Sequence, residues 1–182
     1  MRTSVFVGTS LDGYIARLDG ALDFLDHGGG EAHGYEEFMT TVDALVIGRK
    51  TFETVLGFGG WAYGSKPVFV LSHRELAPTP AGAVVERMHG APAGIVRALA
   101  ARGLEHLYVD GATTIQGFLR AGLIDRLIVT RVPVLIGSGI ALFGALDRDI
   151  ILEHVQTRTY ASGLVQSEYR VGRGGIAEAE ER

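Results

Sequence analysis

The sequence predicts a single α/β domain with a mostly parallel central sheet and a C-terminal antiparallel hairpin. Short apolar runs rich in Val, Ile and Phe alternate with stretches of helical spacing, which is typical of parallel strands joined by helices. The hairpin is predicted because two long strand patterns, 150–160 and 164–171, meet at a Ser-Gly turn. The 182 residues show no internal repeat or linker, so we expect one domain over 1–171 and a disordered tail over 172–182.

Each expected element has a local reason. The strands expected at 44–47 and 67–71 are apolar runs, which suits strands buried on both faces. Further strands are expected at 3–8, which is β-branched and aromatic, and at 83–87, 106–109 and 127–132. The helices place their apolar residues on one face, and glycine follows the predicted ends of three of them. The expected helices are 31–42, 49–56, 93–102 and 113–121.

The composition excludes several classes of function. A net charge of -4 gives no global basic field that would attract nucleic acid. The absence of cysteine excludes disulfides, thiolate catalysis and Cys-based zinc sites, and the six histidines have no spacing typical of a metal site. No apolar stretch approaches the length of a membrane-spanning helix, and the N-terminus lacks the layout of a signal peptide, so a cytoplasmic protein is expected.

Two strand-to-helix turns are suited to binding anions. Gly48-Arg49-Lys50-Thr51 offers backbone N–H groups, a hydroxyl and two cations at a helix start, and Gly111-Ala112-Thr113-Thr114 offers N–H groups and two hydroxyls. A third turn, Leu71-Ser72-His73-Arg74, ends with a guanidinium that could hold the 2′-phosphate separating NADPH from NADH. The alternatives are plain capped helix starts for the first two turns and a solvated loop for the third.

Standard motifs for nucleotide binding and serine catalysis are absent. There is no G-x-G-x-x-G followed by an acid, no Walker loop and no G-x-S-x-G elbow. Asp12, just after the first strand, either binds a substrate group or only shapes its Asp-Gly turn. Glu36 and Glu37 either reach a substrate or are solvated helix charges, and Trp61 either closes over a ring or packs a loop.

Several motifs, in chain order, resemble the C-terminal reductase domain of the bacterial bifunctional riboflavin-biosynthesis deaminase-reductase, of the dihydrofolate reductase-like superfamily. They are Ser10 to Ala16, Val46 to Glu53, Tyr108 to Thr113, Gly122 to Leu127 and Pro133 to Gly139, and the similarity runs over roughly residues 2 to 171. The resemblance implies the three-layer dihydrofolate reductase-like fold, a homodimer and NADPH as hydride donor. It also implies an activity like that of 5-amino-6-(5-phosphoribosylamino)uracil reductase, which reduces the sugar of a ribosylamino-pyrimidine phosphate to ribityl.

The resemblance also implies roles for individual residues. The cofactor-binding residues are expected to be Ile15, Gly48, Arg49, Lys50, Thr51, Leu71, Ser72, His73, Arg74, Asp110, Gly111, Ala112, Thr113, Thr114 and Ile115. The substrate side is expected to be lined by Ser10, Asp12, Glu37, Trp61, Leu135, Gly137 and Ser138, with Asp12 as the catalytic residue. Two departures matter: Gly111-Ala112 stands where the fold often has Gly-Gly, and the helix acid of dihydrofolate reductases has no clear counterpart. A dihydrofolate reductase proper, or a non-catalytic cofactor-binding protein of the same fold, therefore remains an alternative.

Overall fold

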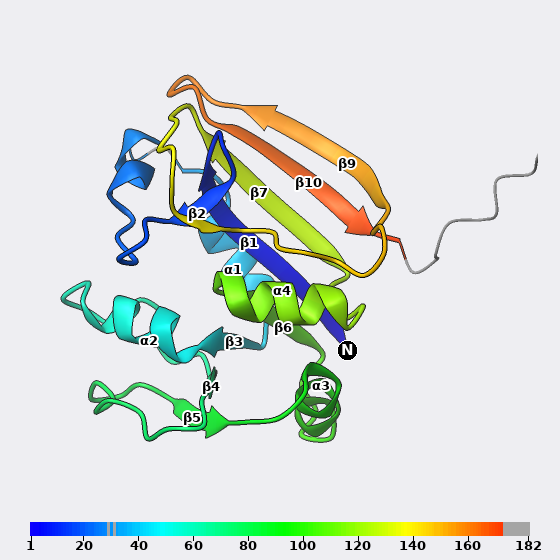
Figure 1. The fold of residues 1–182 in the computed structure, drawn as a ribbon. Coiled ribbons are helices and arrows are strands. Elements are labelled where there is room, and N and C mark those ends of the chain that lie inside the picture. The colour runs from blue at the N-terminus through cyan, green and yellow to red at the C-terminus, as the bar shows by residue number, and fades with distance from the viewer. Residues whose placement is uncertain (29, 31, 173–182) are drawn as a thin grey trace, which may run out of the picture.

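The fold is built on an eight-stranded sheet, in a computed structural model that describes residues 1–28, 30 and 32–172 (Figure 1). Of the tail expected to be disordered over 172–182, residues 173–182 lie outside the described residues. The strands of the main sheet are β1 (Arg2–Ser10), β3 (Ala44–Gly48), β4 (Val68–Leu71), β5 (Val85–Met88), β6 (His106–Asp110), β7 (Arg126–Val132), β9 (Leu152–Thr159) and β10 (Val165–Val171).

The strand order is β5-β4-β3-β6-β1-β7-β10-β9. The first six strands in this order pair in parallel, whereas β10 pairs antiparallel with both β7 and β9. The mostly parallel sheet with a C-terminal antiparallel hairpin is therefore confirmed. Parallel strands end at the same edge of a sheet, so the six turns that follow them lie along one edge.

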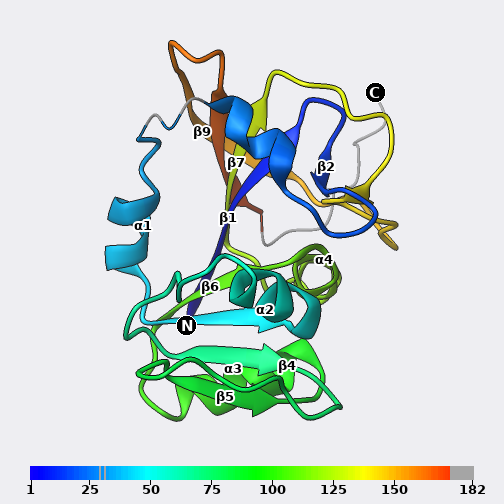
Figure 2. The ribbon, with the colours of Figure 1, turned by 90° about the vertical axis from the view of Figure 1, so that its left-hand side faces the viewer.

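Helices cover both faces of the sheet and make three layers (Figures 1 and 2). One face packs against α3 (Pro92–Ala100) and α4 (Ala112–Arg120), whose buried side chains include Leu99 and Phe118. The other face packs against α1 (Tyr35–Thr41) and α2 (Arg49–Leu56), through side chains such as Phe38 and Phe52. In the described part of the chain, no helix is long and apolar enough to span a membrane.

Three short elements have no counterpart among the sequence predictions. Strands β2 (Tyr14–Ala16) and β8 (Ile140–Ala141) form a second, two-stranded antiparallel sheet, and a 3-10 helix, η1, covers Asp23–Gly28. The β2–β8 pairing joins segments more than 120 residues apart, and neither segment is long enough to show a strand pattern of its own. Helix α1 is also shorter than predicted, because it begins at Tyr35 after Gly34, which has a φ of 81°.

Candidate functional site

The turns that were predicted to bind the cofactor lie together at the C-terminal edge of the parallel strands. Strands β3 and β6 are neighbours, with Ile47 opposite Asp110, so the glycines that follow them, Gly48 and Gly111, come next to each other. Leu71 at the end of β4 is opposite Gly48, which places the Ser72 turn on the other side of the Gly48 turn. The topology therefore brings the three predicted anion-binding turns side by side.

The first two turns contact each other closely. A Cβ atom on Gly111 would lie 2.3 Å from Thr51 Oγ1, and a Cβ atom on Gly48 would lie 3.1 Å from Thr114 Oγ1. Each glycine thus faces a hydroxyl at the start of the other turn's helix. Neither α2 nor α4 has a side chain that caps its first N–H groups. These N–H groups are available to an anion, which is the property expected of a phosphate-binding helix start.

Of the charged side chains near these turns, one forms an ion pair and others are exposed to solvent. Arg49 forms an ion pair with Glu53 one turn along α2, at a half-buried position, and His73 and Arg74 are exposed. The Ser72 hydroxyl accepts a hydrogen bond from the Arg74 N–H at 3.0 Å and donates one to the Arg74 carbonyl at 2.8 Å. Ser72 therefore shapes its turn, while the Arg74 guanidinium extends from it.

Two of the residues predicted to bind the cofactor place their side chains in the core instead of on the turn surface. Ile115 is fully buried between the sheet and α4, and Ile15 packs against the same apolar cluster. Thr114, one residue before Ile115, is also largely buried, and its hydroxyl lies against Gly48. The side chains of Ile15 and Ile115 therefore support the turns by packing in the core, and they do not lie on the turn surface.

Asp12 anchors the loop that follows β7. Its Oδ2 accepts a hydrogen bond from the Gly137 N–H at 2.8 Å, and its Oδ1 accepts one from the Ile136 N–H at 3.3 Å. A hydrogen bond from the Ser10 side chain, assisted by these two backbone N–H groups, lowers the pKa of Asp12. Asp12 is therefore a carboxylate at neutral pH, and it fixes the loop of Leu135 to Ser138 beside the end of β1.

Asp110 is the acidic group that the fold places nearest to the paired glycine turns. It ends β6, and its Oδ1 accepts a hydrogen bond from the Gly111 N–H at 2.7 Å. Burial raises its pKa to about 6. Along a strand, alternate residues share a face, so Asp110 lies on the α1 and α2 side together with Tyr108. The sequence predicted a cofactor contact for Asp110 but did not reveal this raised pKa.

Aromatic side chains lie on the same side of the sheet as this carboxyl group. Burial raises the pKa of Tyr35 to about 12 and raises that of Tyr63, and in both cases the nearby charge of Asp110 adds to the increase. The ring of Trp61 meets the rings of Phe52 and Tyr63 edge to face, at centroid distances of 6.1 and 5.3 Å. Its indole N–H is buried and has no hydrogen-bond partner among the described residues. Trp61 thus packs on the same side as Asp110.

Two other residues predicted to line the substrate side, Glu37 and Leu135, are exposed on the surface. Glu37 is exposed on α1, whereas Tyr35 at the start of that helix is the residue whose pKa responds to Asp110. Leu135 is 69% exposed, in the loop held by Asp12. The strand alternation that puts Tyr108 and Asp110 on one face was available from the sequence. The approach of Tyr35 and Tyr63 was not, because it depends on how α1 and the segment after α2 pack.

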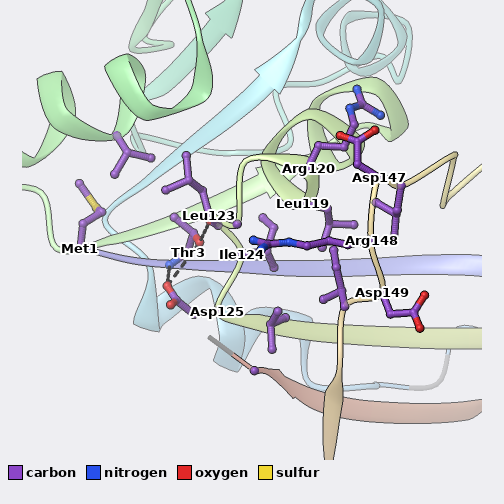
Figure 3. A pocket seen from close by; sticks show the side chains of 16 residues that line it. Met1, Thr3, Leu119, Arg120, Leu123, Ile124, Asp125, Asp147, Arg148 and Asp149 are labelled. Atoms are coloured by element: carbon purple, nitrogen blue, oxygen red, sulfur yellow. Dashed lines mark hydrogen bonds between the residues drawn. The ribbon is translucent and has the colours of Figure 1, made fainter. Parts of the chain in front are cut away.

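A cavity lies at the opposite edge of the sheet. It has a volume of about 690 Å³ and is bounded by the starts of β1 and β7, the end of α4 and the segment 146–150 (Figure 3). None of the predicted site residues lines it. The candidate site therefore does not lie in this cavity.

Comparisons with known proteins show which family the chain belongs to. Residues 4–166 match the family of the RibD C-terminal domain. The chain belongs to this family. It is 32% identical over 174 residues to the uncharacterized Bacillus subtilis protein YwjB, covering 92% of this chain and 97% of that protein. The chain is also 39% identical to a putative riboflavin biosynthesis protein of Shewanella sp. PV-4, whose crystal structure is similar with a TM-score of 0.86. The match covers 95% of this chain and 100% of that one.

A structure with much lower sequence identity has a similar fold. Dihydrofolate reductase from Enterococcus faecalis, solved with NADP(H), is 16% identical and superposes with a TM-score of 0.63 over 93% of this chain and 96% of its own. At this identity the likeness concerns the fold alone, and it confirms the predicted dihydrofolate reductase-like architecture. Membership of the RibD C-terminal domain family identifies the chain as an oxidoreductase of the reductase type found in riboflavin biosynthesis.

Proposed function

We propose that the protein is an NADPH-dependent reductase acting on a ribosylamino-pyrimidine of the kind reduced in riboflavin biosynthesis, and that it works as a homodimer. The observation that carries the proposal is the contact between the turns after β3 and β6, where two uncapped helix starts lie side by side. A pair of such helix starts suits a diphosphate, because each contributes free N–H groups and a favourable dipole. Family membership supports the choice of substrate class.

The residues present fit a dinucleotide phosphate. Gly111 lets the two turns pack closely against Thr51, where a Cβ atom would not fit, and the first N–H groups of both helices have no side-chain cap. Thr51, Thr113 and Thr114 add hydroxyls, and Lys50 and Arg49 add positive charge. Arg74, exposed on the neighbouring turn, would hold the 2′-phosphate. When bound, NADPH supplies the hydride.

The two aspartates are assigned different roles. Reduction of a C=N or C=O bond needs a proton on the heteroatom as the hydride reaches carbon, and a donor works best with a pKa near the operating pH. Asp110, with a pKa of about 6 and no cation bonded to it among the described residues, meets this requirement. Asp12 has a lowered pKa and is held by the N–H groups of Ile136 and Gly137, so it serves to position the loop on the substrate side.

Arg49→Ala tests the phosphate site. Loss of a hydrogen bond to a charged group should weaken NADPH binding by about 1–3 kcal/mol, or about 5- to 150-fold in Kd. The single tryptophan, Trp61, lies on the site side and provides a fluorescence signal for the titration. Arg97→Ala, an exposed arginine on α3, is the matched control and should leave Kd unchanged. Absence of NADPH binding to the wild-type protein at millimolar concentration would refute the proposal.

Cofactor and substrate preference need separate assays. Arg74→Ala should weaken binding of NADPH more than binding of NADH, and equal losses would exclude a role for Arg74 at the 2′-phosphate. Oxidation of NADPH should then be followed with a phosphoribosylamino-pyrimidine and, separately, with dihydrofolate. Turnover with dihydrofolate alone would identify a dihydrofolate reductase proper. Cofactor binding without turnover of either substrate would identify a non-catalytic protein of the same fold.

A further inference from the structure

The cavity at the start of the parallel strands is bounded by parts of the chain that are distant in sequence. Its walls come from α3, the end of α4, the starts of β1 and β7, the segment 146–150 and the end of β10 (Figure 3). Its volume of about 690 Å³ lies within the range of small-molecule sites. None of the residues assigned to the cofactor or the substrate lines it, so the proposed reduction does not explain its presence.

Half of the residues that line the cavity are apolar, and several of them belong to the core. Leu119 and Ile124 are 5% and 3% exposed, and Val96 and Leu123 pack against the same core cluster. Leu146 adds to the wall from the segment 146–150 and is 42% exposed. Because the core holds most of these side chains in place, the cavity presents a fixed apolar surface, which suits the apolar body of an organic molecule.

One arginine extends into this space. Figure 3 shows the side chain of Arg148 reaching from the segment 146–150 across the middle of the cavity. Within the described chain its guanidinium forms no ion pair and no hydrogen bond, whereas six other arginines are ion-paired. A guanidinium carries five N–H donors in a planar fork. The donors of Arg148 are therefore available to an anion inside the cavity.

The acidic residues of the cavity lie apart from this guanidinium. Asp125 is engaged elsewhere, because its Oδ2 accepts a hydrogen bond from the Thr3 N–H at 2.8 Å. Asp147 and Asp149, the chain neighbours of the arginine, direct their carboxylates to other sides in Figure 3. The lining nevertheless holds three aspartates against two arginines, so it repels a doubly charged phosphate more strongly than a single carboxylate.

We propose that this cavity binds a small organic carboxylate, with the carboxylate on Arg148 and the apolar body against Val96, Leu119 and Leu123. A guanidinium matches a carboxylate in plane and spacing, so the two groups form a pair of parallel hydrogen bonds. In a partly apolar hollow, such a charged pair is stronger than in open solvent. The apolar walls add affinity in proportion to the surface of the ligand that they remove from water.

The cavity and the cofactor turns lie at opposite ends of α4. The helix begins after Gly111, and its last residue, Arg120, lines the cavity. Its nine residues span about 13 Å, at about 1.5 Å for each residue. The carboxylate and the cofactor can therefore bind at the same time, and the carboxylate site does not depend on the proposed reductase activity.

Nuclear magnetic resonance with a matched pair of probes tests the site on the full chain. The probes are naphthylacetate and its neutral counterpart naphthylethanol. Naphthylacetate should shift the amide signals of residues 119–124 and 146–150 and should bind about tenfold or more tightly than naphthylethanol. Saturating NADPH should not displace it. Absence of binding at millimolar concentration, equal affinity for the two probes, or displacement by NADPH would overturn the proposal.

Three variants assign the contacts. Arg148→Met keeps a long apolar side chain and should weaken naphthylacetate about tenfold or more while leaving naphthylethanol unchanged. Arg97→Met, at an exposed arginine of α3 that does not line the cavity, is the control and should change neither affinity. Leu146→Trp, at a position exposed enough to spare the core, should fill the cavity and weaken both probes. An unchanged affinity of Arg148→Met for naphthylacetate, or of Leu146→Trp for both probes, would place the ligand elsewhere and refute the site.

Discussion

Replacing Gly111 with alanine should impose two separate penalties at the junction of the two turns. Gly111 has φ 90° and ψ 130°, a conformation that residues with a Cβ atom rarely adopt. The new Cβ atom would also lie 2.3 Å from Thr51 Oγ1, well inside any normal contact. The substitution therefore strains the backbone and forces α2 and α4 apart at their first turns.

The two penalties can be estimated separately. Holding a non-glycine residue in a sparsely populated region of positive φ costs about 1–3 kcal/mol. Relieving the overlap requires Thr51 to leave its rotamer or the backbone to shift, at about 1–3 kcal/mol. The expected loss in the free energy of unfolding is thus about 2–6 kcal/mol, a large part of the stability of a domain of this size. NADPH binding should weaken as well, since both turns move.

Two further variants separate the causes. Gly94→Ala, inside α3 with open space around its Cβ position, should stabilise the protein by about 0.5–1 kcal/mol because alanine favours a helix over glycine. Thr51→Ala removes the hydroxyl that the Cβ atom of Gly111→Ala meets. Combined with Gly111→Ala, it should recover the steric part, about 1–3 kcal/mol, and leave the backbone part.

Urea unfolding followed by circular dichroism measures the wild type, the three single variants and the double variant. The midpoint should fall for Gly111→Ala, rise slightly for Gly94→Ala and recover in part for the double variant. A Gly111→Ala protein within about 0.5 kcal/mol of wild type would show that the close contact between the turns is wrong. Recovery by Thr51→Ala to the full wild-type value would show that the positive φ carries no cost.

Two predictions concern pH. Burial raises the pKa of Asp110 to about 6, so the stability contributed by its neutral form is complete below the ordinary value of 3.8 and is lost as the pH rises through 6. Asp110→Asn should therefore stabilise the protein by about 1–3 kcal/mol near pH 8 and by little near pH 4, and an equal gain at both pH values contradicts this. Because this variant lacks the proposed proton donor, its kcat should fall and should lose the inflection near pH 6. Burial lowers the pKa of His106, which lies 2.7 Å from both the Ser4 hydroxyl and the Thr41 carbonyl. Stability is thus present above the ordinary pKa of 6.5 and is lost as the pH falls below it, and His106→Gln should show a shallower decline in urea midpoint between about pH 7 and pH 5.

Local sequence patterns predicted the elements well because strands such as β3 and β4 are apolar along their whole length. The buried run Ala44 to Ile47 and the helix from Arg49 to Leu56 appear in the structure at the expected positions. Local patterns also identified both glycine turns as helix starts. That the two turns touch depends on β3 and β6 being neighbours, and this strand order arises from packing between segments about 60 residues apart.

The chemistry of the two aspartates was beyond local patterns for the same reason. Asp12 is held by Ile136 and Gly137, which lie more than 120 residues further along the chain. The raised pKa of Asp110 arises from burial, beside a group of aromatic side chains contributed by α1 and by the segment after α2. A sequence shows which residues can carry a proton, but the pKa depends on what the fold packs against them.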